Sequence, residues 1–153
     1  MMRVLTFFTV LLMLCSSYTL ANDAKNSNVT FYNSKPASKK LPFSEMVKVN
    51  DTIYLSGQIG FDSKSGKLAE GGFAAEAHQT LSNIKQTIES HGYTMQHVVK
   101  CMVMLTNIKD FAEFNRIYTQ YFTPPYPVRS AFAVSELALD AKLEVECMAA
   151  VQK

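Results

Sequence analysis

The sequence lacks the short motifs of the commonest catalytic and nucleotide-binding sites. It contains no Gly-x-Ser-x-Gly, no Walker loop, no Gly-x-Gly-x-x-Gly and no Cys-x-x-Cys. These absences exclude, as starting hypotheses, a serine-hydrolase elbow, a phosphate-binding P-loop, a dinucleotide fingerprint and a dithiol redox centre. The three histidines, His78, His91 and His97, have neither i, i+4 spacing nor a companion cysteine or carboxylate cluster. We therefore predict no metal site.

A strong excess of charge of one sign is also missing. In a chain of 153 residues, 15 Lys and Arg stand against 13 Asp and Glu, and Arg3 lies in an amino-terminal segment that we expect to be removed. The remaining basic and acidic residues nearly balance, so nothing favours nucleic acid or an anionic membrane as a partner. A chain of this length has material for one compact domain. We expect its partner to be a small molecule.

The one long apolar run, at the amino end, is too short to span a bilayer. Residues 1–3 are a short basic start, residues 4–15 are apolar, and residues 19–21 (Thr-Leu-Ala) resemble a signal peptidase site. A membrane-spanning helix needs about 20 apolar residues, so we expect no permanent membrane anchor. We interpret residues 1–21 as a signal peptide and predict a periplasmic or secreted protein.

Cysteine is scarce. Once Cys15 leaves with the signal peptide, Cys101 and Cys147 remain, both inside apolar, strand-like runs. The two could pair in an oxidising compartment, but free cysteine is among the commonest buried residues. We therefore predict two buried thiols in preference to a disulfide.

Hydrophobic periodicity predicts the elements that follow the leader. Residues 22–40 are polar and aperiodic, so we expect a flexible N-terminal segment with one short strand at 29–32, followed by a domain over 41–153. In the domain we first predict a hairpin of residues 46–49 and 52–61 about Asn50-Asp51, and then a helix over 74–91 that Gly92 ends. A strand over 98–105, covered on both faces, comes next, and it is followed by a helix that has an Asp110/Glu113 capping box and is ended by Pro124-Pro125. The last predicted elements are strands over 130–134 and 143–151.

The predicted order of elements is β-hairpin, α, β, α, β, β. This order favours an α+β fold in which both helices pack on one face of a single sheet. Apolar residues on the other face would then be uncovered. An uncovered apolar face predicts self-association.

Arg129 is a candidate binding residue because of its position. It is one of two arginines outside the leader, and it lies where a proline-rich loop enters an apolar strand. Its planar guanidinium can hold a carboxylate through two parallel hydrogen bonds. The alternative is a structural salt bridge to Glu144 or Glu146, and spacing alone does not choose between the two.

Glu144 and Glu146 occupy alternate positions of the last predicted strand, so their side chains project from the same face. Two like charges side by side are costly. Either both reach solvent or a partner cation, or one is held protonated by the other, which is how a poised acid or base arises.

Three sequence blocks together resemble the YjgF/Rid family, from about Leu41 to the end of the chain. They are residues 55–59 (Leu-Ser-Gly-Gln-Ile), Phe114-Asn115 with Tyr118, and residues 127–130 (Pro-Val-Arg-Ser) with 143–146 (Leu-Glu-Val-Glu). The resemblance implies a chorismate-mutase-like α+β fold with a mixed, mostly antiparallel sheet. It also implies a homotrimer in which the uncovered sheet faces meet and three clefts lie between subunits.

The resemblance further implies a hydrolytic deaminase that converts 2-imino or enamine acids, such as 2-iminopropanoate, into a 2-oxo acid and ammonia without a cofactor. Arg129 would bind the substrate carboxylate, and Glu144 would place and activate the attacking water. The other residues that it places at the cleft are Phe43, Ser56, Gly57, Asn115 and Ala131.

Two of these positions depart from the family pattern. Phe43 stands where the family usually has tyrosine, and Ala131 stands where it often has cysteine. A hydroxyl and a thiol are therefore absent. Two other functions stay open: a non-catalytic trimer that binds small carboxylates, which the export signal favours, and, more weakly, an endoribonuclease.

Overall fold

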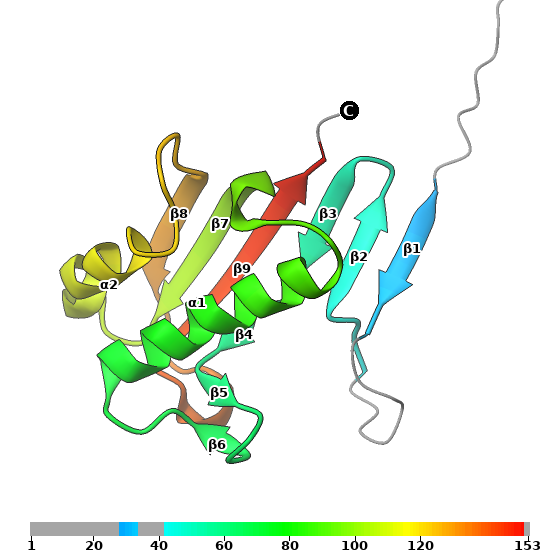
Figure 1. Cartoon of the computed structure of the whole chain (residues 1–153). Helices are drawn as coiled ribbons and strands as arrows, with labels where there is room; N and C mark the ends of the chain where they lie inside the picture. Colours follow the sequence, from blue (N-terminus) through cyan, green and yellow to red (C-terminus); the bar gives the residue numbers. More distant parts are fainter. Residues whose placement is uncertain (1–27, 34–41, 152–153) are drawn as a thin grey trace, which may run out of the picture.

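The computed structural model describes residues 28–33 and 42–151, which form a twisted mixed sheet with two helices (Figure 1). The main sheet has the strand order β1-β2-β3-β9-β7-β8, with β4 also paired to β9, while β5 and β6 form a separate ribbon. Its strands are β1 (Val29–Tyr32), β2 (Met46–Val49), β3 (Thr52–Leu55), β4 (Gln58–Ile59), β7 (Val98–Leu105), β8 (Val128–Ala133) and β9 (Leu143–Ala150). The ribbon consists of β5 (Phe61–Asp62) and β6 (Lys67–Leu68), and the helices are α1 (Phe73–Ser90) and α2 (Phe111–Tyr118).

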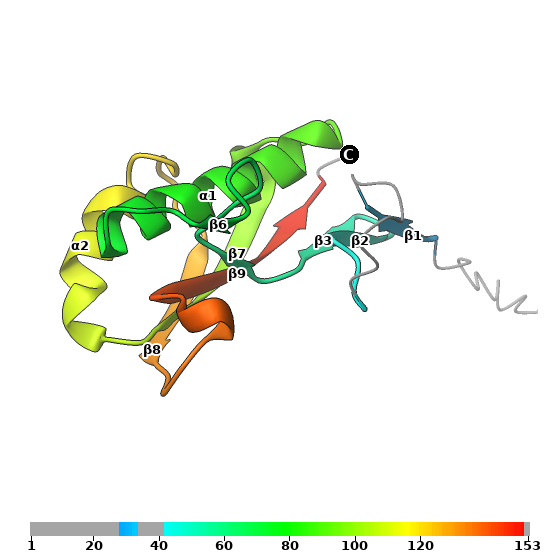
Figure 2. The same cartoon turned by 90° about the horizontal axis from the view of Figure 1, so that it is seen from below.

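The sheet is mixed and mostly antiparallel, as predicted. Within the described chain, β7 and β8 are the parallel pair, and the other pairs are antiparallel. Figure 2 shows α1 and α2 on the same side of this sheet. The α+β class and the placement of both helices on one face are therefore confirmed.

The amino-terminal hairpin forms at the predicted turn. Asn50 adopts a φ of 54°, and its side-chain oxygen accepts a hydrogen bond from Asn28 N at 3.1 Å. The predicted strand at 29–32 is β1, and it pairs with β2 at the edge of the sheet. The predicted signal peptide, residues 1–21 with its cleavage site, lies outside the described residues.

The second arm of that hairpin is not the continuous strand predicted over 52–61. It divides into β3, β4 and β5, and the first interruption is at Ser56 and Gly57. β3 pairs with the end of β9, and β4 pairs with its beginning. Periodicity did not reveal the break, because apolar residues resume at Ile59 directly after the short polar stretch at residues 56–58.

The helix α1 agrees with the prediction within one residue at each end and stops before Gly92, which has a φ of 83°. In α2, by contrast, two predictions were wrong. Asp110 makes no capping hydrogen bond, because its own backbone is helical and Asn107 instead accepts from Lys109 N to begin the preceding 3-10 turn. The helix ends at Tyr118 rather than at the prolines, since the chain tightens there to stack Phe122 on Tyr118 at 4.3 Å.

The core lies between the helices and one face of the sheet. Along β9, Leu143, Val145, Cys147 and Ala149 are buried, while the residues between them are half-buried. The strand β7 was predicted to be covered on both faces, but in this chain its Val99 is 46% exposed. The prediction failed because both helices cover the same face.

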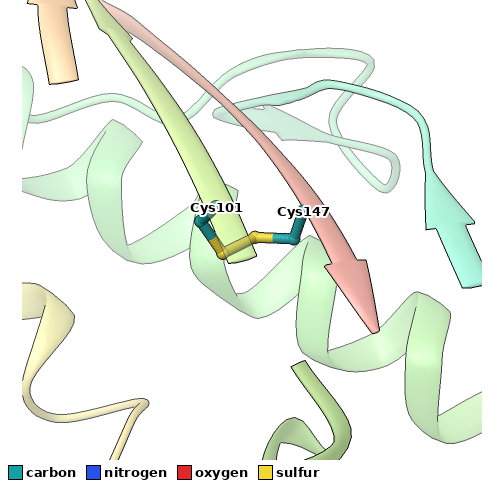
Figure 3. The surroundings of a disulfide bond; sticks show 2 residues. All are labelled: Cys101 and Cys147. Carbon is teal, nitrogen blue, oxygen red and sulfur yellow. A yellow bond between two sulfur atoms is a disulfide. The ribbon is translucent and has the colours of Figure 1, made fainter. Parts of the chain in front are cut away.

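Cys101 and Cys147 form a disulfide, so the prediction of two free thiols was wrong (Figure 3). Both residues are buried, as expected, but they also lie directly opposite each other on β7 and β9, with 4.1 Å between their Cα atoms. Opposite residues of an antiparallel pair are close enough for such a bond. An apolar run shows that a cysteine is buried and does not show which strand lies beside it.

The open face of the sheet carries exposed aromatic and aliphatic side chains. Tyr54 is 45% exposed, and on the edge strand β8 Val128 and Phe132 are 67% and 42% exposed. Glu144 shares this face, in one cross-strand row with Met104 and Phe132. Within residues 28–33 and 42–151, no helix is long and apolar enough to cross a bilayer.

Candidate active site

Arg129 lies near the start of β8 and points to the helix-covered side of the sheet, toward α2. Its neighbour on β7 is the buried Cys101. The carbon atom at the centre of its guanidinium lies 4.7 Å from the ring centre of Tyr118, and 5.5 and 5.6 Å from those of Phe111 and Phe114. Cations over aromatic faces at these distances are stabilised electrostatically. The aromatic residues along α2 therefore support Arg129.

Asn115 completes this support. Its side-chain oxygen accepts a hydrogen bond from a terminal guanidinium nitrogen of Arg129. The structure thus brings together two of the predicted site residues, Arg129 and Asn115. Beside them lies an open hollow of about 350 Å³, the Arg129 hollow, which is lined by Asn115, Tyr118, Thr119, Tyr126, Pro127 and Arg129.

No carboxylate of a described residue pairs with Arg129, since the ion pairs between described residues are Lys85–Glu89 and Glu113–Arg116. The alternative of a structural salt bridge to Glu144 or Glu146 is therefore wrong within this chain. The Arg129 hollow has no acidic residue in its lining. Its charge suits a small anion.

Tyr118 is a residue of the hollow that sequence analysis quoted only as part of a resemblance. Its side chain is 4% exposed, and its hydroxyl has no hydrogen-bond partner among the described residues. Burial raises the pKa of Tyr118 to about 12, partly opposed by the positive charge of Arg129. Tyr126 was not predicted at all. The signal for both was the proximity of aromatic residues to Asn115 and Arg129 in sequence.

Glu144 lies on β9 in a different environment, which we call the Glu144 corner (Ser56, Gly57 and Glu144). Gly57 is packed so closely against Glu144 that a side chain at position 57 would collide with the carboxylate. The interruption between β3 and β4 places this glycine there. Glu144 forms no ion pair or hydrogen bond with another described residue, so its carboxylate is available to a group outside the described residues.

The segment that contains Phe43 is tied to this corner. The Ser56 hydroxyl donates to the Ser44 carbonyl oxygen at 2.6 Å, and Ser56 N donates to the Glu45 carbonyl oxygen at 3.0 Å. Phe43 itself is 55% exposed. Phe43, Ser56, Gly57 and Glu144 therefore belong to one neighbourhood.

The two regions do not meet within one chain. Arg129 faces the helices, whereas Glu144 lies on the open face, because the residues beside it on β9 are the buried ones. The strands that carry them are also separated by β7. Ala131 lies on the helix side, against the core, two positions after Arg129. Within the described residues, no group of His, Cys, Asp and Glu side chains is placed to hold a metal ion.

The chain matches known proteins along most of its length. Residues 33–151 match the model of the family described as Endoribonuclease L-PSP. A human 2-iminobutanoate/2-iminopropanoate deaminase is 44% identical over 108 residues, which cover 71% of this chain and 79% of the human protein. The chain thus belongs to the Endoribonuclease L-PSP family, which is the YjgF/Rid family.

Solved structures agree with this assignment. The crystal structure of RidA from the Antarctic bacterium Psychrobacter sp. is 37% identical, with a TM-score of 0.72 over 80% of this chain and 98% of that one. The structure of Escherichia coli TdcF with bound serine is 28% identical, with a TM-score of 0.71 over 80% of this chain and 98% of that one. The family expected from the three sequence blocks is therefore confirmed, as is an α+β fold with two helices and a mixed sheet.

Proposed function

We propose that this protein is a cofactor-independent hydrolytic deaminase of small 2-imino or enamine acids, such as 2-iminopropanoate. The observation that carries the proposal is Arg129, a guanidinium held by Asn115 and three aromatic rings and facing a hollow without a carboxylate partner among the described residues. The names of the human relative and of the serine-bound structure support a small substrate that carries a carboxylate.

The chemistry needs orientation and proton transfer more than strong activation. Arg129 holds the substrate carboxylate through two charge-assisted hydrogen bonds, which orients the imine carbon. Glu144 accepts a proton from a water molecule as that water attacks the carbon of the protonated imine, which gives a carbinolamine. The nitrogen then takes up a proton and the carbinolamine hydroxyl loses one as the carbon–nitrogen bond breaks, which releases ammonia and leaves a 2-oxo acid.

We also propose that the complete site forms between copies of the chain in a homotrimer. Arg129 and Glu144 lie on opposite faces of one sheet, so a single chain does not present both to one small substrate. The exposed Tyr54, Val128 and Phe132 on the open face support its burial against another copy. Sedimentation equilibrium should give three times the mass of the mature chain, and a monomer would contradict the assembly.

The activity is tested by coupling to an amino-acid oxidase, which releases the imine in solution. We expect the protein to accelerate release of ammonia and 2-oxo acid, and Arg129→Ala to lose at least about 100-fold in kcat/KM, since a bidentate charged contact is lost. Arg129→Lys keeps the positive charge but loses the planar, two-pronged guanidinium, so it should recover little of the lost kcat/KM. Equal rates for Arg129→Ala and the unmodified protein would overturn the assignment.

The same assay separates the alternative functions. A non-catalytic carboxylate-binding trimer would bind 2-oxobutanoate without accelerating imine hydrolysis. An endoribonuclease, the activity in the family's description, would cleave RNA in a way that Arg129→Ala or Glu144→Gln abolishes. The near balance of 15 basic and 13 acidic residues gives little electrostatic support for RNA binding.

We further propose that the protein matures in an oxidising compartment, periplasmic or extracellular, after removal of residues 1–21. The Cys101–Cys147 disulfide supports this location, because such bonds are rare in reducing compartments. Intact-mass analysis of the native protein should show a chain that begins at Asn22 and has no thiol open to alkylation after unfolding. A retained leader with three reactive thiols, Cys15 among them, would contradict the proposal.

A further inference from the structure

Glu76, in the first turn of α1, is a buried acidic residue that the proposed reaction does not use. It is 5% exposed, whereas most acidic residues of folded proteins lie at the surface. A buried carboxylate is costly unless it accepts hydrogen bonds, and this one accepts a bond from the backbone N–H of Lys142 at 2.8 Å. The two residues are 66 positions apart in the chain. Glu76 therefore joins α1 to the segment that leads into β9.

Lys142 lies two residues before Glu144, and both of its backbone polar groups are held. Glu76 accepts from its N–H, while its carbonyl oxygen accepts bonds from the backbone N–H and the hydroxyl of Thr106, at 3.0 and 3.2 Å. Glu144 is the second residue of β9, and the ends of an element open more readily than its middle. The bond between Glu76 and Lys142 therefore fixes β9 at the end that carries Glu144.

The strand that pairs with β9 at Glu144 is β4, and α1 holds this strand as well. α1 packs over both β4 and β9 (Figure 1). β4 has two residues, of which Ile59 lies opposite Glu144. The side-chain amide nitrogen of Asn83 on α1 donates to the carbonyl oxygens of Ile59 and Phe61, at 3.1 and 2.9 Å. Gln79 donates to the Asn83 side-chain oxygen at 2.8 Å, which fixes the amide in this orientation. A strand this short is weakly held by its own ladder, so its position depends on α1.

We propose that Glu76 and Asn83, which we call the α1 clamp, are positioning residues for the Glu144 carboxylate. This inference rests on the proposed function, and both residues act from the helix-covered side of the sheet, away from the reacting groups. On the open face, no described residue holds the Glu144 carboxylate by an ion pair or hydrogen bond. Its place is therefore set by the backbone that carries it, and the α1 clamp holds the two strands that form this backbone. A misplacement of about 1 Å in a catalytic group can slow a reaction about 100-fold.

The first test compares Glu76→Ala with Glu76→Gln in the full mature protein. Glu76→Ala leaves the Lys142 N–H without its acceptor, so we expect kcat for imine hydrolysis to fall at least about ten-fold. Binding of 2-oxobutanoate, measured by calorimetry, should change less than about two-fold, because Arg129 is untouched. Glu76→Gln keeps an acceptor oxygen, so it should retain kcat within about two-fold. A Glu76→Gln variant as slow as Glu76→Ala would show that the charge and not the hydrogen bond matters, and would overturn the α1 clamp.

Asn83→Ala tests the other half of the α1 clamp, since it releases β4 and leaves the bond between Glu76 and Lys142 in place. It should also lower kcat more than it changes the binding of 2-oxobutanoate. Hydrogen exchange followed by mass spectrometry gives a readout that needs no catalysis. In Glu76→Ala we expect exchange at least about ten-fold faster over residues 142–145 and unchanged over residues 147–150. Equal exchange over 142–145 in Glu76→Ala and the unmodified protein would overturn the α1 clamp.

Ile88→Ala is the matched control for a general loss of stability. Ile88 is buried in the last turn of α1, and its truncation should lower the melting temperature at least as much as Glu76→Ala does. Its kcat, measured at a temperature where every variant is folded, should stay unchanged. An equal loss of kcat in Ile88→Ala and Glu76→Ala would show an effect of stability alone and overturn the α1 clamp.

The same measurements separate a failure of the α1 clamp from a failure of the proposed function. If Glu144→Gln is inactive while Glu76→Ala and Asn83→Ala keep full kcat, the α1 clamp is wrong and the proposed function stands. If the unmodified protein does not accelerate imine hydrolysis, both are wrong.

Discussion

The Arg129 hollow and the Glu144 corner are built in different ways. Arg129 is held by side chains of its own subunit, since α2 provides Asn115 and three aromatic rings around the guanidinium. Glu144 has no hydrogen-bonding or ionic partner among the described residues, and only the absence of a side chain at Gly57 makes room for it. The difference indicates that one chain preorganises Arg129, the proposed carboxylate anchor. The surroundings of Glu144, the proposed acid–base group, depend on what meets the open face.

The largest expected effect tests whether the two regions cooperate across copies. Arg129→Ala and Glu144→Gln should each be nearly inactive alone. Co-expressed in equal amounts, they should form trimers in which about one quarter of the clefts contain both intact residues, so about one quarter of the activity should return. No recovery in trimers proven by mass analysis to be mixed would show that the residues act within one chain.

The disulfide joins β7 and β9, the strands that link the two regions (Figure 3). The residues it joins are 46 apart in sequence, and closing such a loop constrains the unfolded chain by about 4 kcal/mol. The double variant Cys101→Ala/Cys147→Ala should lose roughly this free energy of unfolding in guanidinium titrations. A loss below about 1 kcal/mol would mean that the bond contributes little.

Substitutions at two glycines, Gly60 and Gly57, distinguish an effect on packing from an effect on activity. A side chain at Gly60 would meet the backbone of Glu76, with its Cβ 2.7 Å from Glu76 Cα, so Gly60→Ala should cost about 2–3 kcal/mol. At Gly57 the obstacle is the movable end of the Glu144 side chain. Gly57→Ala should therefore cost less than about 1 kcal/mol yet lower deaminase activity about ten-fold, by displacing the carboxylate. Thermal unfolding measures the loss of stability in each variant, and the oxidase-coupled assay measures the loss of activity. A Gly57→Ala variant with full activity would show that the position of the Glu144 carboxylate does not matter for the reaction.

The smallest effect concerns alkaline pH. Burial raises the pKa of Tyr118 from 10.0 to about 12, so its stabilising contribution is complete below pH 10 and is lost as pH rises toward 12. Between pH 9 and 11, Tyr118→Phe should lose about 1 kcal/mol less stability than the unmodified protein. Urea titrations at the two pH values measure this difference, and parallel losses would show that the phenol titrates normally in the fold.

Local patterns in the sequence were sufficient for most elements. The spacing of Leu81, Ile84 and Ile88 predicted α1, and Asn50 with Asp51 predicted the first hairpin. Arg129 stood out by its rarity and position. These predictions succeeded because side-chain periodicity and turn chemistry act over a few residues.

Most of the predictions that failed depended on residues distant in the sequence. The break at Ser56 and Gly57 lies against the carboxylate of Glu144, nearly 90 positions later in the chain. The disulfide follows from the register of β7 on β9. The false capping box at Asp110 arose because Asn107 began the turn first. Tyr118 was named only in a family block, and its burial beside Arg129 required the tertiary structure.

By itself the sequence determined the family, the α+β order of elements and the identity of Arg129 and Glu144 as the residues to examine. Only the tertiary structure decided that Arg129 is supported by α2, that the two cysteines are joined, and that Arg129 and Glu144 lie on opposite faces of the sheet. The physical reason is that periodicity records which side of its own element a residue occupies. Which other element lies there is set by packing and strand register.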